Sequence, residues 1–128
     1  MAILVFVVDD MKKLSDLLAR ALSNLELEVE NFYDAEAARA RAIERSPSIL
    51  ITDIEMPGMD GIALAREIHE FNPHCDIVVM SASSRYNPYL SSRVNSTDSF
   101  TFLQKPFPLA QLLSLVSCLT RQRLPNEN

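Results

Sequence analysis

Ile49-Leu-Ile-Thr-Asp-Ile-Glu-Met-Pro-Gly-Met-Asp-Gly61 is the stretch of the chain that decides its fold. Its apolar start is typical of a strand buried on both faces, and that strand ends at Asp53. Residues 56–61 contain one proline and two glycines, which predicts a loop. The helical period that follows ends before Pro73, and its inward face is expected to hold Ile62, Ala65, Ile68 and Phe71. Strand, loop and helix in this order indicate one βα unit of a parallel sheet.

The same alternation extends along the chain in both directions. Four further strands are expected at Ile3–Val8, Val29–Tyr33, Ile77–Met80 and Thr101–Leu103. Further helices are expected from Met11 to Leu25, from Asp34 to Ser46 and from Pro108 to Arg123. The inward faces of the first two are predicted to be Leu14, Leu17, Leu18, Ala21, Leu22 and Leu25, and Ala35, Ala38, Ala42 and Ile43. This pattern predicts an α/β fold with a doubly wound, five-stranded parallel sheet and right-handed crossovers.

Composition limits the class of protein. The 128 residues favour one domain, and 48% hydrophobic with 23% charged residues excludes a chain that is disordered throughout. The formal net charge of −5 disfavours nucleic-acid binding, which depends on clustered cations. No apolar run approaches the roughly 20 residues of a membrane span, so no membrane contact is expected.

The start of the chain and its two cysteines indicate the compartment of the protein and the state of its thiols. The apolar start of the chain lacks a basic leader and leads directly into Asp9 and Asp10, so it is interpreted as a strand and not as a signal peptide. The cytoplasm is therefore expected. Cys75 and Cys118 are far apart in sequence, and two free thiols are favoured over a disulfide in a reducing compartment.

Polar residues follow the predicted strands at the points where the strands end. They are Asp9 and Asp10, Asp53, Ser81 and Lys105. Each could be an ordinary cap, turn or surface residue. In open α/β sheets, however, functional residues collect outside the carboxyl ends of the strands. Clustered aspartates repel one another unless a cation joins them, and Mg²⁺ prefers carboxylates together with water and phosphate. A carboxylate can also act as a nucleophile toward phosphorus.

Four motifs together resemble the receiver domain of two-component response regulators. They are Asp9-Asp10, the stretch from Asp53 to Gly61, Ser81-Ala82 and Lys105-Pro106, and the resemblance runs from about residue 3 to about residue 121. It implies a flavodoxin-like sheet of order 2-1-3-4-5 with five helices. The receiver domain is assigned to residues 1–123, and residues 124–128 form a short polar tail.

The resemblance also implies a role for each matching residue. Asp53 matches the phosphoacceptor and contributes to the metal site. Asp10 matches the direct Mg²⁺ ligand, and Asp9 the residue that acts through metal-bound water. The backbone carbonyl of Glu55 matches the remaining protein ligand.

Three further residues are assigned to catalysis and switching in the same way. Ser81 matches the switch hydroxyl that moves toward the phosphoryl oxygens, beside the backbone N–H of Ala82. Lys105 matches the cation that pairs with the phosphate and precedes a bond that is usually cis in the family, and Phe102 matches the switch aromatic.

The implied function is signalling. A sensor histidine kinase or a histidine phosphotransfer protein would donate the phosphoryl group in a Mg²⁺-dependent reaction. The protein would catalyse only its own phosphotransfer and autodephosphorylation. A face made of the fourth helix, the fifth strand and the fifth helix would then bind a downstream protein target or a C-terminal output domain.

Three alternatives belong to other classes. A metal-dependent phosphatase would need a cap domain, for which 128 residues leave no room. A flavin carrier would need a phosphate loop rich in Ser, Thr and Gly where this chain has Asp9-Asp10-Met-Lys12. A degenerate receiver that acts only as a docking module would not need its site residues, all of which are present.

The segment between Ser81 and Lys105 departs from the family pattern. Residues 83–99 are rich in Ser, Asn and Thr, contain Pro88 and lack the expected glycine. These residue types are poor helix formers, so the fourth helix is expected to be short or irregular and to begin near Pro88.

Overall fold

The computed structural model describes residues 3–83 and 100–123. Five parallel strands form one sheet in the order β2-β1-β3-β4-β5, as predicted. The strands are β1 Leu4–Val8, β2 Glu28–Phe32, β3 Ile49–Asp53, β4 Asp76–Ser81 and β5 Phe100–Gln104. The helices are α1 Lys12–Ser23, α2 Ala35–Glu44, α3 Gly61–Phe71 and α5 Leu109–Arg123. None of these helices is long and apolar enough to cross a membrane.

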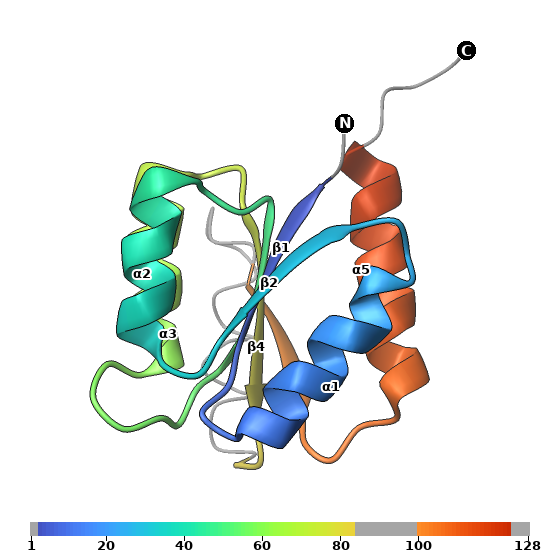
Figure 1. Ribbon diagram of the computed structural model, residues 1–128, viewed down its shortest axis with the longest axis horizontal. Coiled ribbons are helices and arrows are strands. Elements are labelled where there is room, and N and C mark those ends of the chain that lie inside the picture. Colours follow the sequence, from blue (N-terminus) through green and yellow to red (C-terminus); the bar gives the residue numbers. More distant parts are fainter. Residues whose placement is uncertain (1–2, 84–99, 124–128) are drawn as a thin grey trace.

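The helices cover both faces of the sheet, so the molecule has three layers (Figure 1). Helices α2 and α3 lie on one face and α1 and α5 on the other. Successive residues of a strand point to opposite faces, so Phe6 packs in the α2/α3 core while Val5 and Val7 pack in the α1/α5 core. The central strands β1 and β3 are buried along their whole length, because both of their faces are covered.

Edge strand β2 is stabilised in a different way. All five of its residues are partly exposed. Glu28 and Glu30 form ion pairs with Arg45 and Arg41 of α2 or its C-cap. Exposed pairs of this kind contribute little each, about 0–1 kcal/mol, so they add only modestly to the stability of this edge.

Three residues predicted to face inward are exposed instead. Ile43, Leu17 and Phe71 are 67%, 52% and 48% exposed. Ile43 follows the buried Ala42 by one residue, which turns it about 100° away from the sheet. Leu17 borders an apolar hollow beside α1, and Phe71 is the last residue of α3.

Two other differences concern helix number and helix ends. The part of the chain that the structure describes has four helices, one fewer than the five expected, and the fourth helix predicted near Pro88 lies outside the described residues. The predicted polar tail, residues 124–128, also lies outside them.

Helix α2 ends at Glu44 and not at Ser46, because Arg45 is already extended. The predicted cap of α2 is confirmed, since Asp34 accepts a bond from the Ala37 N–H at 2.7 Å.

Candidate functional site

The predicted polar residues meet at one edge of the sheet. Asp9 follows β1, Asp53 ends β3, Ser81 ends β4 and Lys105 follows β5. These strands are neighbours and run parallel, so their carboxyl ends lie side by side. The predicted position of these polar residues, at the carboxyl ends of neighbouring strands, is confirmed.

Three carboxylates converge at this edge. Asp9, Asp10 and Asp53 each offer one oxygen, and these oxygens all lie within 4.8 Å of one another. The side chains of Asp9 and Asp53 are 1% and 10% exposed, whereas Asp10 is exposed. Burial raises the pKa of Asp53 from 3.8 to about 6, with Lys105 opposing the rise and the charges of Asp9 and Asp10 adding to it.

Lys105 bridges two of the carboxylates. Its Nζ lies 3.0 Å from Asp9 Oδ2 and 3.4 Å from Asp53 Oδ1. The other oxygen of Asp9 accepts a bond from the Met11 N–H at 3.0 Å. Met11 is the N-cap residue of α1, and its own side chain makes no capping bond. Asp9 is thus held from both sides in a fixed position within the cluster.

The cluster fits a hard divalent cation. Its donors are all carboxylate oxygens, and one lysine leaves the three negative charges only partly neutralised. Burial is the main reason that the pKa of Asp53 is raised, and the neighbouring negative charges of Asp9 and Asp10 raise it further. Mg²⁺ takes oxygen ligands of this kind from one or two carboxylates, with water completing its shell.

Ser81 is engaged by the side chain of Glu55, a contact that the sequence did not predict. The Ser81 hydroxyl is fully buried and donates to Glu55 Oε1 at 2.8 Å. The oxygen of the Ser81 hydroxyl also accepts a bond from the Ser83 N–H at 2.9 Å. The backbone carbonyl of Glu55 was predicted to take part in the site, but the bond from Ser81 to its side chain was not. Glu55 and Ser81 are 26 residues apart, and no spacing signal in the sequence links them.

The backbone around Asp53 explains why the loop ends in glycine. A Cβ atom on Gly61 would lie 1.9 Å from the backbone oxygen of Asp53, a distance that no side chain can occupy. The Gly61 N–H also donates to the Ile54 carbonyl at 2.8 Å. Any larger residue at this position would therefore displace the strand end that carries Asp53.

The position of Lys105 is fixed by the neighbouring strand. Its N–H donates to the Ser81 carbonyl at 2.8 Å, which joins the ends of β4 and β5. The Lys105–Pro106 peptide bond is cis, as the resemblance implied. Phe102, the proposed switch aromatic, lies on β5, partly buried against the α2/α3 core. Its role as a switch remains a prediction.

Comparisons with known proteins agree with this geometry. The sequence model for the response regulator receiver domain matches residues 5–117. The chain is 33% identical to the DNA-binding transcriptional regulator NtrC of Salmonella typhimurium over 113 residues, which cover 88% of this chain and 24% of NtrC. It is 31% identical to the transcriptional regulatory protein PrrA of Mycobacterium leprae over 93% of this chain and 50% of that protein. The chain thus spans about a quarter to a half of these relatives.

Solved structures give the same result. The response regulator TrrA of Thermotoga maritima, in complex with Mg²⁺ and BeF, has a TM-score of 0.79 and 28% identity over 91% of this chain and 98% of TrrA. A Francisella response regulator receiver domain has a TM-score of 0.81 over 94% of this chain and 98% of that chain, and at 21% identity it supports the fold alone. The sheet order, the cluster at its edge and the family match lead to one conclusion: this chain belongs to the receiver-domain family of two-component response regulators.

Proposed function

We propose that the chain receives a phosphoryl group from a phosphohistidine onto Asp53 and holds it as an aspartyl phosphate. The supporting observation is that Asp53 lies with Asp9, Asp10 and Lys105 at one edge of the sheet. A carboxylate oxygen of Asp53 attacks phosphorus, and a new O–P bond forms as the P–N bond of the donor breaks. The electron pair of the broken bond stays on the imidazole nitrogen. The protein catalyses only this transfer and the later hydrolysis of the aspartyl phosphate by water, so it acts as a signalling protein.

Mg²⁺ is the proposed cofactor. The side chains of Asp9, Asp10 and Asp53 and the backbone carbonyl of Glu55 would hold it. When bound, it neutralises charge on the phosphoryl group during transfer. Lys105 supplies a second positive charge beside the Asp53 oxygen, and Ser81 donates a hydrogen bond to the phosphoryl oxygens.

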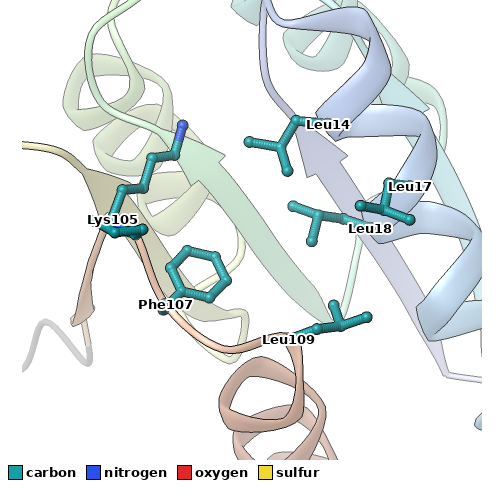
Figure 2. Close-up of a pocket in the computed structure, with 7 residues that line it drawn as sticks. Leu14, Leu17, Leu18, Lys105, Phe107 and Leu109 are labelled. Carbon is teal, nitrogen blue, oxygen red and sulfur yellow. The ribbon is translucent and has the colours of Figure 1, made fainter.

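The phosphodonor is proposed to be a histidine kinase or a phosphotransfer protein that docks beside α1. An apolar hollow opens there between α1 and the start of α5 (Figure 2). Leu14, Leu17 and Leu18 come from α1, and Lys105, Phe107 and Leu109 come from the segment after β5. Because Lys105 lines the hollow and also contacts Asp53, a protein seated there would bring its phosphohistidine close to the acceptor.

Output is proposed to occur by protein contact. Phosphorylation would alter the face that contains β5 and α5, with Ser81 and Phe102 as the moving side chains, and this face would bind a downstream protein or an output domain. The third component of that face, the expected fourth helix, lies outside the described residues. A docking module without phosphorylation is the alternative function.

A small phosphodonor tests the chemistry without a partner protein. Acetyl phosphate and Mg²⁺ should add one phosphoryl group per chain by intact mass, and chelation of Mg²⁺ by EDTA should prevent it. Asp53→Asn should abolish the gain, whereas Asp60→Asn, on the N-cap of α3, should retain it. Equal labelling of the Asp53→Asn protein would contradict the assignment, and no labelling of the wild type would favour the docking module.

A protein donor tests the docking surface. Leu17→Asp should slow transfer from a phosphorylated histidine phosphotransfer protein at least about tenfold more than it slows labelling by acetyl phosphate. Ile43→Asp is the matched control, because Ile43 is also apolar and exposed but lies on α2, across the sheet. If the two variants affect transfer equally, the hollow is not the docking site.

A further inference from the structure

The Ser81 hydroxyl already has two hydrogen-bond partners in the unphosphorylated protein. A serine hydroxyl has one proton to donate and lone pairs to accept with. In this structure the proton goes to Glu55 Oε1 at 2.8 Å, and a lone pair accepts from the Ser83 N–H at 2.9 Å. Since the acceptor is a carboxylate, the bond to Glu55 belongs to the stronger, charge-assisted kind.

The backbone leaves Ser81 little freedom except at its side chain. The Ser81 carbonyl accepts from the Lys105 N–H at 2.8 Å on the β5 side. On the β3 side the Ile54 N–H donates to the Met80 carbonyl at 2.8 Å, which fixes the residues next to Glu55 and Ser81 in register. A change of partner for the hydroxyl therefore takes place by rotation of the Ser81 side chain, which breaks its bond to the Glu55 carboxylate.

Loss of this bond costs the Glu55 carboxylate little. Ser81 is buried, but Glu55 is exposed, so its carboxylate can return to water when the bond breaks. A phosphoryl group on Asp53 is itself an anion with strong acceptor oxygens. It competes with Glu55 for the single Ser81 proton and also repels the Glu55 charge.

We propose that the Glu55 carboxylate is a latch that holds the Ser81 hydroxyl away from the phosphoryl position and so opposes activation. This inference rests on the proposed function and assigns a regulatory role to a side chain within the same site. Glu55 acts through Ser81 and is a positioning residue. The Ser83 N–H bonds to the same hydroxyl, so release of the latch also changes the hydrogen bonding of Ser83, where the chain leaves β4.

The effect of the negative charge of Glu55 must be separated from the effect of its hydrogen bond to Ser81. Removal of any nearby carboxylate favours anion binding through electrostatics alone, whether or not it touches Ser81. A double-mutant cycle separates the two, because the latch needs the Ser81 hydroxyl and the charge effect does not. Beryllofluoride with Mg²⁺ serves as the probe, bound to the intact chain and measured by isothermal titration calorimetry.

Glu55→Ala is expected to tighten beryllofluoride binding about tenfold, equivalent to about 1.4 kcal/mol. In the Ser81→Ala background, Glu55→Ala should increase the affinity for beryllofluoride less than about threefold. Glu55→Gln should increase the affinity less than Glu55→Ala does, because the amide oxygen of glutamine still accepts the hydroxyl proton. In the metal-free protein, Glu55→Ala should also shift the amide resonance of Ser83, since the hydroxyl to which Ser83 donates has lost its acceptor.

Two results would overturn the latch. One is an equal gain from Glu55→Ala in both backgrounds, which would show that charge alone acts. The other is weaker binding by Glu55→Ala, which would show that Glu55 assists activation. Failure of the folded wild-type chain to bind beryllofluoride with Mg²⁺ at all would remove the proposed function and the latch together, so the two failures can be told apart.

Discussion

Replacement of Asp53 by asparagine should stabilise the protein in the absence of metal. Asp53 is 10% exposed, and burial together with Asp9 and Asp10 raises its pKa to about 6 even though Lys105 opposes the rise. A raised pKa means that the folded state holds the proton of this carboxyl more tightly than the unfolded state does. The ionised carboxylate is therefore a source of instability in the fold, which asparagine removes while keeping the shape of the side chain.

The magnitude follows from the size of the rise. From 3.8 to about 6, the shift corresponds to about 3 kcal/mol, since a factor of ten in proton affinity is worth about 1.4 kcal/mol. The contribution of Asp53 to the free energy of unfolding should decline as the pH rises from about 3.8 to about 6 and then remain level. This shift already includes the opposing charge of Lys105 and therefore sets the upper value. The expected gain of Asp53→Asn at pH 7.5 is about 1–3 kcal/mol, and it should nearly vanish near pH 4.

Urea unfolding in EDTA, followed by far-UV circular dichroism at pH 7.5 and pH 4, measures this gain. Asp10→Asn is the matched control, because Asp10 belongs to the same cluster but is exposed, and its gain should be smaller. A variant Asp53→Asn that is no more stable than the wild type at pH 7.5 would refute the reasoning. A gain of the same size at both pH values would also refute it.

Three further predictions use other parts of the site and core. Gly61→Ala should lower the free energy of unfolding by more than about 1 kcal/mol and slow labelling by acetyl phosphate, because its Cβ would meet the Asp53 carbonyl; urea unfolding and intact mass check this. An aromatic disulfide reagent should modify Cys118 quickly and leave Cys75 unmodified at pH 8, since burial raises the pKa of Cys75 to about 12; two fast thiols would contradict it. Lys105→Gln should tighten Mg²⁺ binding by about threefold or more, because it removes a positive charge that competes with the cation for the carboxylates. Calorimetry measures the affinity for Mg²⁺, and weaker binding by the variant would be the contrary result.

The sequence predicted the sheet well because its central strands are buried on both faces. The apolar residues 49–51 that begin β3 are visible without any structure, and the parallel arrangement then places Asp53, at the end of that strand, beside the ends of the neighbouring strands. The cluster of Asp9, Asp10 and Asp53 was predictable for the same reason. The order of the strands and the role of each residue came from the resemblance and not from the period of the pattern.

What the sequence did not predict depends on contacts between distant segments. Ile43 continues an apolar pattern but lies one helical step beyond the buried Ala42, and only the packing of α2 shows which of the two faces the sheet. The bond between Glu55 and Ser81 depends on the register of β3 and β4, which brings together residues 26 positions apart. The constraint on Gly61 likewise becomes visible only once the Asp53 backbone lies against it.

The residue that carries the phosphoryl group can be located directly by mass spectrometry. After labelling with acetyl phosphate and Mg²⁺, borohydride reduces an acyl phosphate to an alcohol, which converts the labelled aspartate to homoserine. Trypsin then separates Asp53, in residues 46–66, from Asp9 and Asp10, in residues 1–12, and fragmentation distinguishes Asp53 from Asp60. Homoserine is expected at position 53 alone. Homoserine at Asp9, Asp10 or Asp60, or at no aspartate, would contradict the assignment of Asp53 as the phosphoacceptor.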